Sequence, residues 1–299
     1  MPITLNFAQR KPQALDSIEI YRKTPGNATI DVNAPGTPLA TLPGDATSYE
    51  DNAVENNTTY RYWIAAVKDG ERVFNTPTAQ GFFLDTGPGP QKLLYGDWHA
   101  GYFGTVTPAE LFTYAELNSL VVNIFGYAVS AWHKFIYKNR ILFMSDNAII
   151  STTPQQIYNQ GLMYGQNGNG FVPGWATARN QLRTVAKNGY EYVVRLPYLF
   201  DYKYWTSFVG SGNSVLYLDG EWFNTFARLY NYSGLLPRFD DLPVGPTDSI
   251  NIPQSAFFAA MANSAGQWYN RPPTPESPSW NNYGTSAIRS IVVLELVLP

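Results

Sequence analysis

The chain reads Thr59-Tyr60-Arg61-Tyr62-Trp63-Ile64-Ala65-Ala66-Val67 within its first hundred residues. Aromatic and β-branched residues dominate this run, which favours an extended strand. Successive side chains of a strand point to opposite faces, so Tyr60 and Tyr62 share one face and Trp63 takes the other. Asp69-Gly70 follows at once, a pair that tolerates the positive φ of a tight hairpin turn. The stretch therefore predicts a long strand followed by a return strand.

The residues before this run extend the β pattern to a whole domain. Residues 17–22 alternate in the same way, and Val54 stands six places before Tyr60. The series Thr47–Asp51, Val54 and Thr59–Val67 resembles the second half of a fibronectin type III domain, in which a tyrosine hydroxyl bonds back to the backbone. Asn56-Asn57 replaces the usual Pro-Gly of that family, a change that asparagine's tolerance of turns permits. The resemblance implies an all-β sandwich of fibronectin III or immunoglobulin-like type, serving as a spacer.

A short Gly/Pro stretch divides the chain. Thr86-Gly87-Pro88-Gly89-Pro90 cannot sustain a helix or a central strand. We therefore expect a β-sandwich over residues 1–86, a linker over 87–90 and a second domain over 91–299.

The second domain has the pattern of a mixed α+β fold. Thr107-Pro108-Ala109-Glu110 and Thr153-Pro154-Gln155-Gln156 are capping boxes with proline at the first helical position. The first predicts a helix as far as Leu120, and the second predicts a short helix through Tyr158 that Gly161 ends. Residues 221–230 predict an amphipathic helix with Trp222, Phe226 and Leu229 on one face.

Turn residues in the same region predict strands. Lys138-Asn139 divides an apolar run over residues 132–144 into a hairpin, and Lys187-Asn188-Gly189 precedes a strand over residues 190–196. The last residues, 290–298, are rich in β-branched side chains and predict a buried terminal strand.

Composition limits the classes of function. The 299 residues carry a net charge of −3, and 14% are charged, against about 25% in a typical soluble domain. Without a basic excess the chain is not expected to bind nucleic acid. No apolar run reaches the roughly 20 residues of a membrane helix, and no signal peptide is expected at the start. The absence of cysteine excludes disulfides and thiolate metal sites.

Candidate groups for catalysis are few. His99 and His133 are the only histidines, and no nucleophile motif accompanies them. Gly165–Gly170 lacks the third glycine of a dinucleotide site and the lysine of a phosphate loop, so it predicts a flexible turn. Glycoside hydrolysis needs only two carboxylates, for which the second domain offers Asp219, Glu221, Asp240, Asp241 and Glu276. We expect no enzyme activity, no metal site and no cofactor.

Aromatic residues supply the candidate binding positions. Those outside strongly periodic segments are Trp205, Trp268, Trp280 and Tyr283. Such side chains can stack on sugar rings or anchor a protein interface, and they can equally complete a core. Trp63, expected on the outward face of the sandwich, is the candidate contact residue of the first domain.

An ordered series of short motifs runs through the second domain. Its landmarks are Leu94–Asp97, Gly101–Val106, Trp132–Phe135, Ile157–Gly165, Tyr192–Leu196, Glu221-Trp222 and Val292–Leu296. The series resembles a domain of tailed-bacteriophage virion proteins described as tail-fibre or virion structural proteins. The Glu-Trp segment and the closing strand are also similar to C-type-lectin-like domains of phage receptor-binding proteins.

The resemblance implies a non-enzymatic virion component, assembled in the bacterial cytoplasm, at the tail, neck or collar, or capsid exterior. It would contact other virion proteins and form a homo-oligomer. The alternatives are an adhesin that recognises a host surface glycan or receptor through the loop aromatics, and a glycan-degrading enzyme that uses Asp219 and Glu221.

Overall fold

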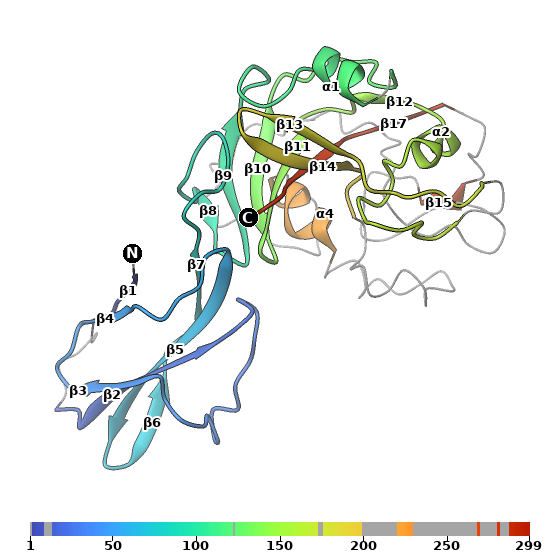
Figure 1. The fold of residues 1–299 in the computed structure, drawn as a ribbon. Helices are drawn as coiled ribbons and strands as arrows, with labels where there is room; N and C mark the ends of the chain where they lie inside the picture. The colour runs from blue at the N-terminus through green and yellow to red at the C-terminus, as the bar shows by residue number, and fades with distance from the viewer. Residues whose placement is uncertain are drawn as a thin grey trace. The chain divides into compact units, whose positions relative to one another are not determined.

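The chain forms two compact units in a computed structural model. The structure describes residues 2–8, 14–121, 123–172, 176–198, 220–229 and 287–299, with the backbone alone at 268–269, 280–281 and 288. Unit 1 comprises Met1–Thr86 with Asp97–Ala100, and unit 2 comprises Gly87–Gly96 with Gly101–Pro299. Gly87–Pro90, expected to be a linker, thus falls within unit 2. Over the described residues, the regular secondary structure of both units is mainly β-strand (Figure 1).

Unit 1 is all-β over its described residues. A larger sheet has the order β3-β2-β5-β6, with β7 also paired to β5, and β1 pairs with β4 in a two-stranded sheet. The strands are β1 (Ile3–Asn6), β2 (Ser17–Lys23), β3 (Ala40–Pro43), β4 (Ser48–Asp51), β5 (Thr58–Lys68), β6 (Glu71–Phe74) and β7 (Thr78–Phe82). The predicted long strand and its return are therefore confirmed. Asp69 and Gly70 adopt φ of 51° and 80° at the turn between them.

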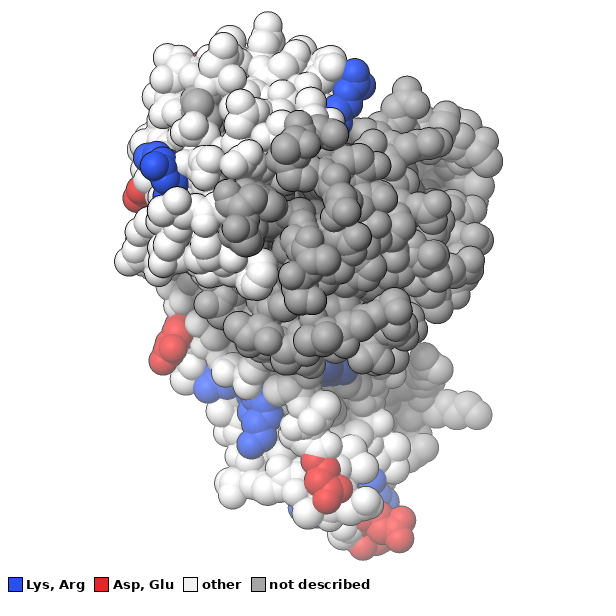
Figure 2. All heavy atoms as spheres, turned by 90° about the vertical axis from the view of Figure 1, so that its right-hand side faces the viewer, with Lys and Arg blue, Asp and Glu red and all other residues white. Residues whose placement is uncertain are grey.

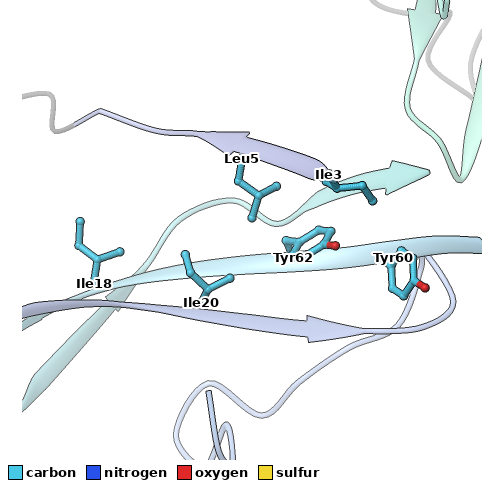
Figure 3. Close-up of a cluster of buried hydrophobic side chains, with 6 residues drawn as sticks. All are labelled: Ile3, Leu5, Ile18, Ile20, Tyr60 and Tyr62. Atoms are coloured by element: carbon cyan, nitrogen blue, oxygen red, sulfur yellow. The ribbon is translucent and has the colours of Figure 1, made fainter. Parts of the chain in front are cut away.

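One face of β5 packs against the small sheet. Ile3 and Leu5 of β1 point toward Tyr60 and Tyr62 of β5 (Figure 3). Ile18 and Ile20 of β2 complete this buried cluster. The period-two pattern placed Tyr60 and Tyr62 on one face, and their burial together confirms it.

Tyr60 also makes a hydrogen bond of the kind that the resemblance to fibronectin type III domains implies. Its hydroxyl accepts from the backbone N–H of Glu55 at 2.7 Å, five residues upstream. The bond fixes the segment that enters β5, because it ties the loop backbone to a side chain of the core.

Tyr60→Phe is expected to lower the free energy of unfolding by about 1–2 kcal/mol, because the Glu55 N–H loses its partner while the ring stays in place. Tyr49→Phe is the matched control, since Tyr49 is only half-buried against the same cluster. Chemical denaturation of the full chain measures both changes. Equal effects of the two variants would contradict a special role for Tyr60.

The other face of β5 is covered, contrary to expectation. Trp63 is 5% exposed and packs with Tyr21 and Ala65, and the loop residues Ala28 and Ile30 lie against this cluster. The predicted alternation is confirmed, since Trp63 and Tyr62 lie on opposite faces of β5. The expectation that its ring faces solvent was wrong, because local periodicity does not reveal that the loop between β2 and β3 folds over that face.

Asp97–Ala100 adds an aromatic contact to unit 1. Trp98 stacks on Phe83 with ring centroids 5.3 Å apart and an interplanar angle of 9°. Gly81 of β7 lies under the same indole, and a Cβ at Gly81 would overlap its ring atoms. Glycine is therefore required there for the close approach of Trp98.

Gly81→Ala is expected to displace the Trp98 ring and to destabilise unit 1 by about 1–3 kcal/mol. In a Trp98→Ala background the same substitution should cost much less, because the overlapping ring is gone. The ¹⁹F resonance of fluorotryptophan at position 98, together with denaturation of the four proteins of this cycle, measures the coupling. Additive costs would contradict the contact.

Unit 2 is built on a seven-stranded sheet of order β13-β14-β18-β11-β10-β9-β8 (Figure 1). Its strands are β8 (Tyr95–Gly96), β9 (Ala100–Val106), β10 (Trp132–Tyr137), β11 (Arg140–Ser145), β13 (Thr184–Lys187), β14 (Tyr190–Arg195) and β18 (Val293–Leu296). The C-terminal β18 lies between β14 and β11 and runs antiparallel to both. Val293 and Leu294 are fully buried, which confirms the predicted terminal strand in a shorter form.

Shorter elements complete unit 2. β12 (Ile150–Thr152) pairs with β17 (Ile288–Ser290), and β15 (Trp268–Tyr269) pairs with β16 (Trp280–Asn281). The helices are α1 (Tyr114–Leu120), α2 (Pro154–Asn159), α4 (Glu221–Asn224) and the 3₁₀-helix η2 (Phe226–Leu229). Helix is thus a minor part of the described residues.

The two hairpin turns and one of the helices are as the sequence predicts. Lys138 and Asn139 have φ of 48° and 65°, and Asn188 and Gly189 have φ of 55° and 84°. The Thr153 capping box begins α2, and Gly161 follows its end with φ of 74°.

The predicted start of the first helix, at Thr107, is wrong. The Thr107–Glu110 capping bonds do form, but they close only a turn. Helix α1 begins six residues later, at a second capping box of Thr113 and Glu116. Leu111 and Phe112, between the two boxes, are both fully buried. Consecutive residues on a helix point in different directions, so the burial of both favours a bend over a continuous helix.

The helix predicted over residues 221–230 is broken at Thr225. This residue has φ of −123°, and its hydroxyl donates to the Glu221 carbonyl at 2.6 Å. Such a local side-chain bond competes with the helical hydrogen bond. Trp222 and Phe226 nevertheless share one buried face, with ring centroids 4.8 Å apart.

Candidate functional site

Three sequence landmarks of unit 2 meet in one buried ionic network. Arg195 ends β14, Glu221 begins α4, and Glu295 lies in β18, an inner strand of the sheet. Arg195 donates to Glu221 through both terminal nitrogens, at 2.8 and 2.7 Å. Its Nε and Nη2 donate to Oε2 of Glu295 at 2.9 and 2.6 Å. Planar guanidinium is suited to such a paired geometry.

Further groups complete this network. Arg140 Nη1 lies 3.1 Å from Glu221 Oε2 and 3.5 Å from Glu295 Oε2, so two guanidiniums balance two carboxylates. The Tyr198 ring lies 3.8 Å from the Arg195 guanidinium carbon, and the Tyr198 N–H donates to Glu221. We call Arg140, Arg195, Tyr198, Glu221 and Glu295 the ionic cluster.

A fourth landmark packs against the ionic cluster. A Cβ at Gly165 would lie 2.5 Å from Arg195 Cδ, so a larger residue has no room there. The preceding carbonyl, of Tyr164, accepts the Tyr198 hydroxyl at 2.6 Å. Tyr164 and Gly165, which end the Ile157–Gly165 landmark, therefore pack against Arg195 and hold Tyr198 beside it.

The charges of the ionic cluster reinforce one another. Burial disfavours ionisation of Glu295, but Arg195 and Arg140 more than offset it and hold the pKa of that carboxyl below its usual value. Burial likewise disfavours the charge of Arg195, while Glu221 and Glu295 raise its pKa well above the ordinary value. Burial also raises the pKa of Tyr198 to about 12, so its hydroxyl stays protonated at neutral pH.

This geometry suits a structural role for Glu221 better than a catalytic one. A glycosidase acid needs a proton to give, and its nucleophile needs an accessible oxygen. Both oxygens of Glu221 accept from Arg195, and the residue is 1% exposed. The other carboxylate candidates, Asp219, Asp240, Asp241 and Glu276, lie outside the described residues.

The histidines occupy different settings. His133 Nδ1 lies 3.0 Å from the Tyr102 hydroxyl, and burial lowers the pKa of His133 to about 4 against a smaller opposing effect of Asp146. His133 is therefore neutral at pH 7. Near His99, Asp97 Oδ1 accepts the backbone N–H groups of His99 and Ala100, which makes Asp97 a turn residue.

The Gly165–Gly170 turn is tied to its surroundings. Gly165, Gly168 and Gly170 all have positive φ, which explains the glycines. The Gly168 carbonyl accepts from the Gln181 N–H at 2.8 Å. A flexible turn was predicted here. The turn is present, but the bond between the Gln181 N–H and the Gly168 carbonyl restrains part of it.

The structure pairs the two short strands that contain Trp268 and Trp280. β15 and β16 form one ribbon in which Trp268 stands opposite Asn281 and Trp280 opposite Tyr269. Only the backbone of these residues is described. Trp205 and Tyr283 lie outside the described residues.

The described surface carries an aromatic–cation pair formed by Arg289 and Tyr127. The Arg289 guanidinium lies 4.3 Å from the Tyr127 ring, and its Nη2 donates to the Tyr127 hydroxyl at 2.6 Å. On the face drawn in Figure 2, described charges of both signs are scattered among neutral residues. No described helix is long and apolar enough to cross a membrane, and the described residues hold no group of three His, Asp or Glu that could bind a metal.

The sequence contained a signal for the ionic cluster that the interpretation missed. Arg195 follows Tyr192-Val193-Val194, and Glu295 stands within Val293–Leu296, so opposite charges interrupt two apolar strands. Charges in buried strands need partners, which makes such a pair a candidate for a contact. Lys134, within Trp132–Tyr137, gives the same signal.

Comparison with protein-family models, with curated proteins and with solved structures found no match to this chain.

Proposed function

We propose that this chain is a non-enzymatic structural component of a tailed-phage particle that acts through protein–protein contacts. The observation that carries the proposal is the convergence of Arg195, Glu221, Glu295 and Gly165 on the ionic cluster. These residues belong to four of the landmarks by which unit 2 resembles virion proteins. Arg195 binds Glu221 and Glu295, and Gly165 packs against Arg195, so a requirement of the fold is sufficient to account for these four motifs.

Unit 1 suits a spacer or attachment module of fibronectin type III-like fold. The Tyr60–Glu55 bond and the packing of two sheets support that finer assignment. A fold does not by itself identify a function, so this assignment supports one point of the proposal: unit 1 can serve to attach unit 2 to a particle. Several symmetric copies would contact neighbouring virion proteins at the tail, neck or capsid exterior.

Immunogold labelling of intact virions tests the proposal, with an antibody raised against residues 91–299. We expect gold at one defined position on the particle. Particles produced without this chain are the control and should carry none. Two results together would refute the proposal. The antibody recognises the native protein but does not label intact virions, and mass spectrometry does not find the chain among the proteins of those virions.

A host-binding role is the second candidate, and the β15–β16 ribbon favours it. The ribbon pairs Trp280 with Tyr269 on neighbouring strands, and directly opposite positions of an antiparallel pair share one face. Aromatic residues gathered in this way can form a stacking surface for sugars. Lectin-like recognition by unit 2 would follow.

Trp280→Ala should then reduce adsorption of particles to host cells by about tenfold or more, as expected for an interface hot spot. Trp63→Phe is the control, because Trp63 is buried in unit 1. Full adsorption by a folded Trp280→Ala particle would remove Trp280 from the site.

A further inference from the structure

Lys134 lies at the centre of a ring of backbone carbonyls. It belongs to β10, the residue is 0% exposed, and its Nζ donates to the carbonyls of Gly87, Pro88 and Pro90 at 3.2, 2.9 and 2.7 Å. Two aromatic faces line the same space, with Nζ 5.1 Å from the Phe103 centroid and 5.7 Å from that of Phe143. Carbonyl oxygens and ring faces both attract a cation.

The Gly/Pro sequence gives these carbonyls their direction. Gly87 and Gly89 both have φ of 77°, a conformation that side-chain-bearing residues rarely adopt. A Cβ at Gly87 would lie 3.1 Å from Leu296, and one at Gly89 would overlap Val106. The alternating prolines limit the remaining freedom, since their φ is fixed.

A second side chain holds the same segment. Gln91 Nε2 donates to the carbonyl of Gly87 at 2.6 Å and to that of Gly89 at 3.0 Å. The Gly87 carbonyl thus accepts from both Lys134 and Gln91. Gly87–Pro90 is therefore organised around its carbonyls.

We propose that Gly87–Pro90 is a backbone cation site whose occupant is the ammonium group of Lys134. This internal cation fixes the segment as part of unit 2. A free primary ammonium ion can take its place when the side chain is shortened. The site is independent of the proposed function, because it shares no residue with the ionic cluster on which that proposal rests.

Chemical rescue tests this site. Lys134→Ala removes three methylene groups and the amine, so n-propylammonium has the shape of the missing part. In the variant, we expect faster deuterium exchange of peptides covering residues 87–92 and a lower Tm than in the wild type. Added n-propylammonium at about ten times its Kd should slow that exchange and raise Tm by roughly 3–6 °C.

The neutral analogue n-propanol is the matched probe, because it fills the same space without a charge. Rescue by n-propylammonium alone supports a cation site, and wild-type protein should respond to neither compound. Equal rescue by both compounds would show an apolar packing role and overturn the proposal. Rescue by neither compound, with the variant folded, would also overturn it.

A measurement on wild-type protein covers the case in which Lys134→Ala does not fold. A buried ammonium held by carbonyls exchanges its protons slowly, so its ¹H–¹⁵Nζ correlation should be resolved at neutral pH. Lys134→Arg or Lys134→Met identifies the resonance. Rapid solvent exchange of every lysine ammonium group would overturn the proposal.

Discussion

Arg195→Met is expected to lower the free energy of unfolding by about 3–5 kcal/mol, enough to unfold a marginally stable domain. Arg195 and Glu221 are both almost fully buried, and Arg195 makes paired bonds to Glu221 and two further bonds to Glu295. When the Arg195 guanidinium is removed, Arg140 is the one positive charge of the ionic cluster that remains to balance the carboxylates of Glu221 and Glu295. The cost arises mainly from the uncompensated buried charge.

Two further variants separate charge from packing. Arg195→Met combined with Glu221→Gln should recover part of the loss, because the charges are again balanced. Arg195→Lys should be intermediate, since it keeps the charge but loses the planar fork. Urea denaturation of all three proteins measures these differences.

Lys187→Met is the matched control, because Lys187 makes a partly exposed ion pair with Glu116 at 2.8 Å in the same unit. Its cost should stay below about 1 kcal/mol. If Arg195→Met costs no more than Lys187→Met, the ionic cluster does not stabilise the fold as argued.

The second large effect is a loss of stability in mild acid through His133. Burial lowers the pKa of His133 to about 4 in the folded protein, whereas unfolded histidine titrates near 6.5. Between these values the unfolded chain binds the additional proton, so stability falls as pH drops through this window. The loss from pH 7 to pH 4 is expected to be about 3 kcal/mol.

Folding stability measured from pH 7 to pH 5 tests this effect. That interval lies above the usual carboxyl pKa of 4.5, so the acid sensitivity of Glu295 adds little there. His133→Gln should remove most of the slope, whereas His99→Gln should retain it. An NMR titration of His133 in the folded protein with a midpoint above 6 would contradict the expectation.

Local structure was largely predictable from the sequence. Asp69-Gly70, Lys138-Asn139 and Asn188-Gly189 adopt the positive φ that their hairpins require. The Thr153 capping box begins α2 through bonds to residues three positions away. Each of these features depends on neighbours in the chain, so short patterns contain the information.

The misjudged features depend on distant parts of the chain. Trp63 is covered by a loop that the alternation of β5 does not reveal, and the start of α1 depends on where Leu111 and Phe112 find a core. The function proposed from resemblance stays a prediction, as do the roles of Trp205 and Tyr283.

The sequence by itself determined the turns, the helix caps and the alternation of strand faces, because φ preferences and contacts three or four residues apart are local. Only the tertiary structure decided which charges are neutralised. Arg195 meets Glu221 across 26 residues and Glu295 across 100, and Lys134 meets the Gly87 carbonyl across 47. The energy of a buried charge depends on the partners that folding brings to it, and the residues beside it in the chain do not specify them.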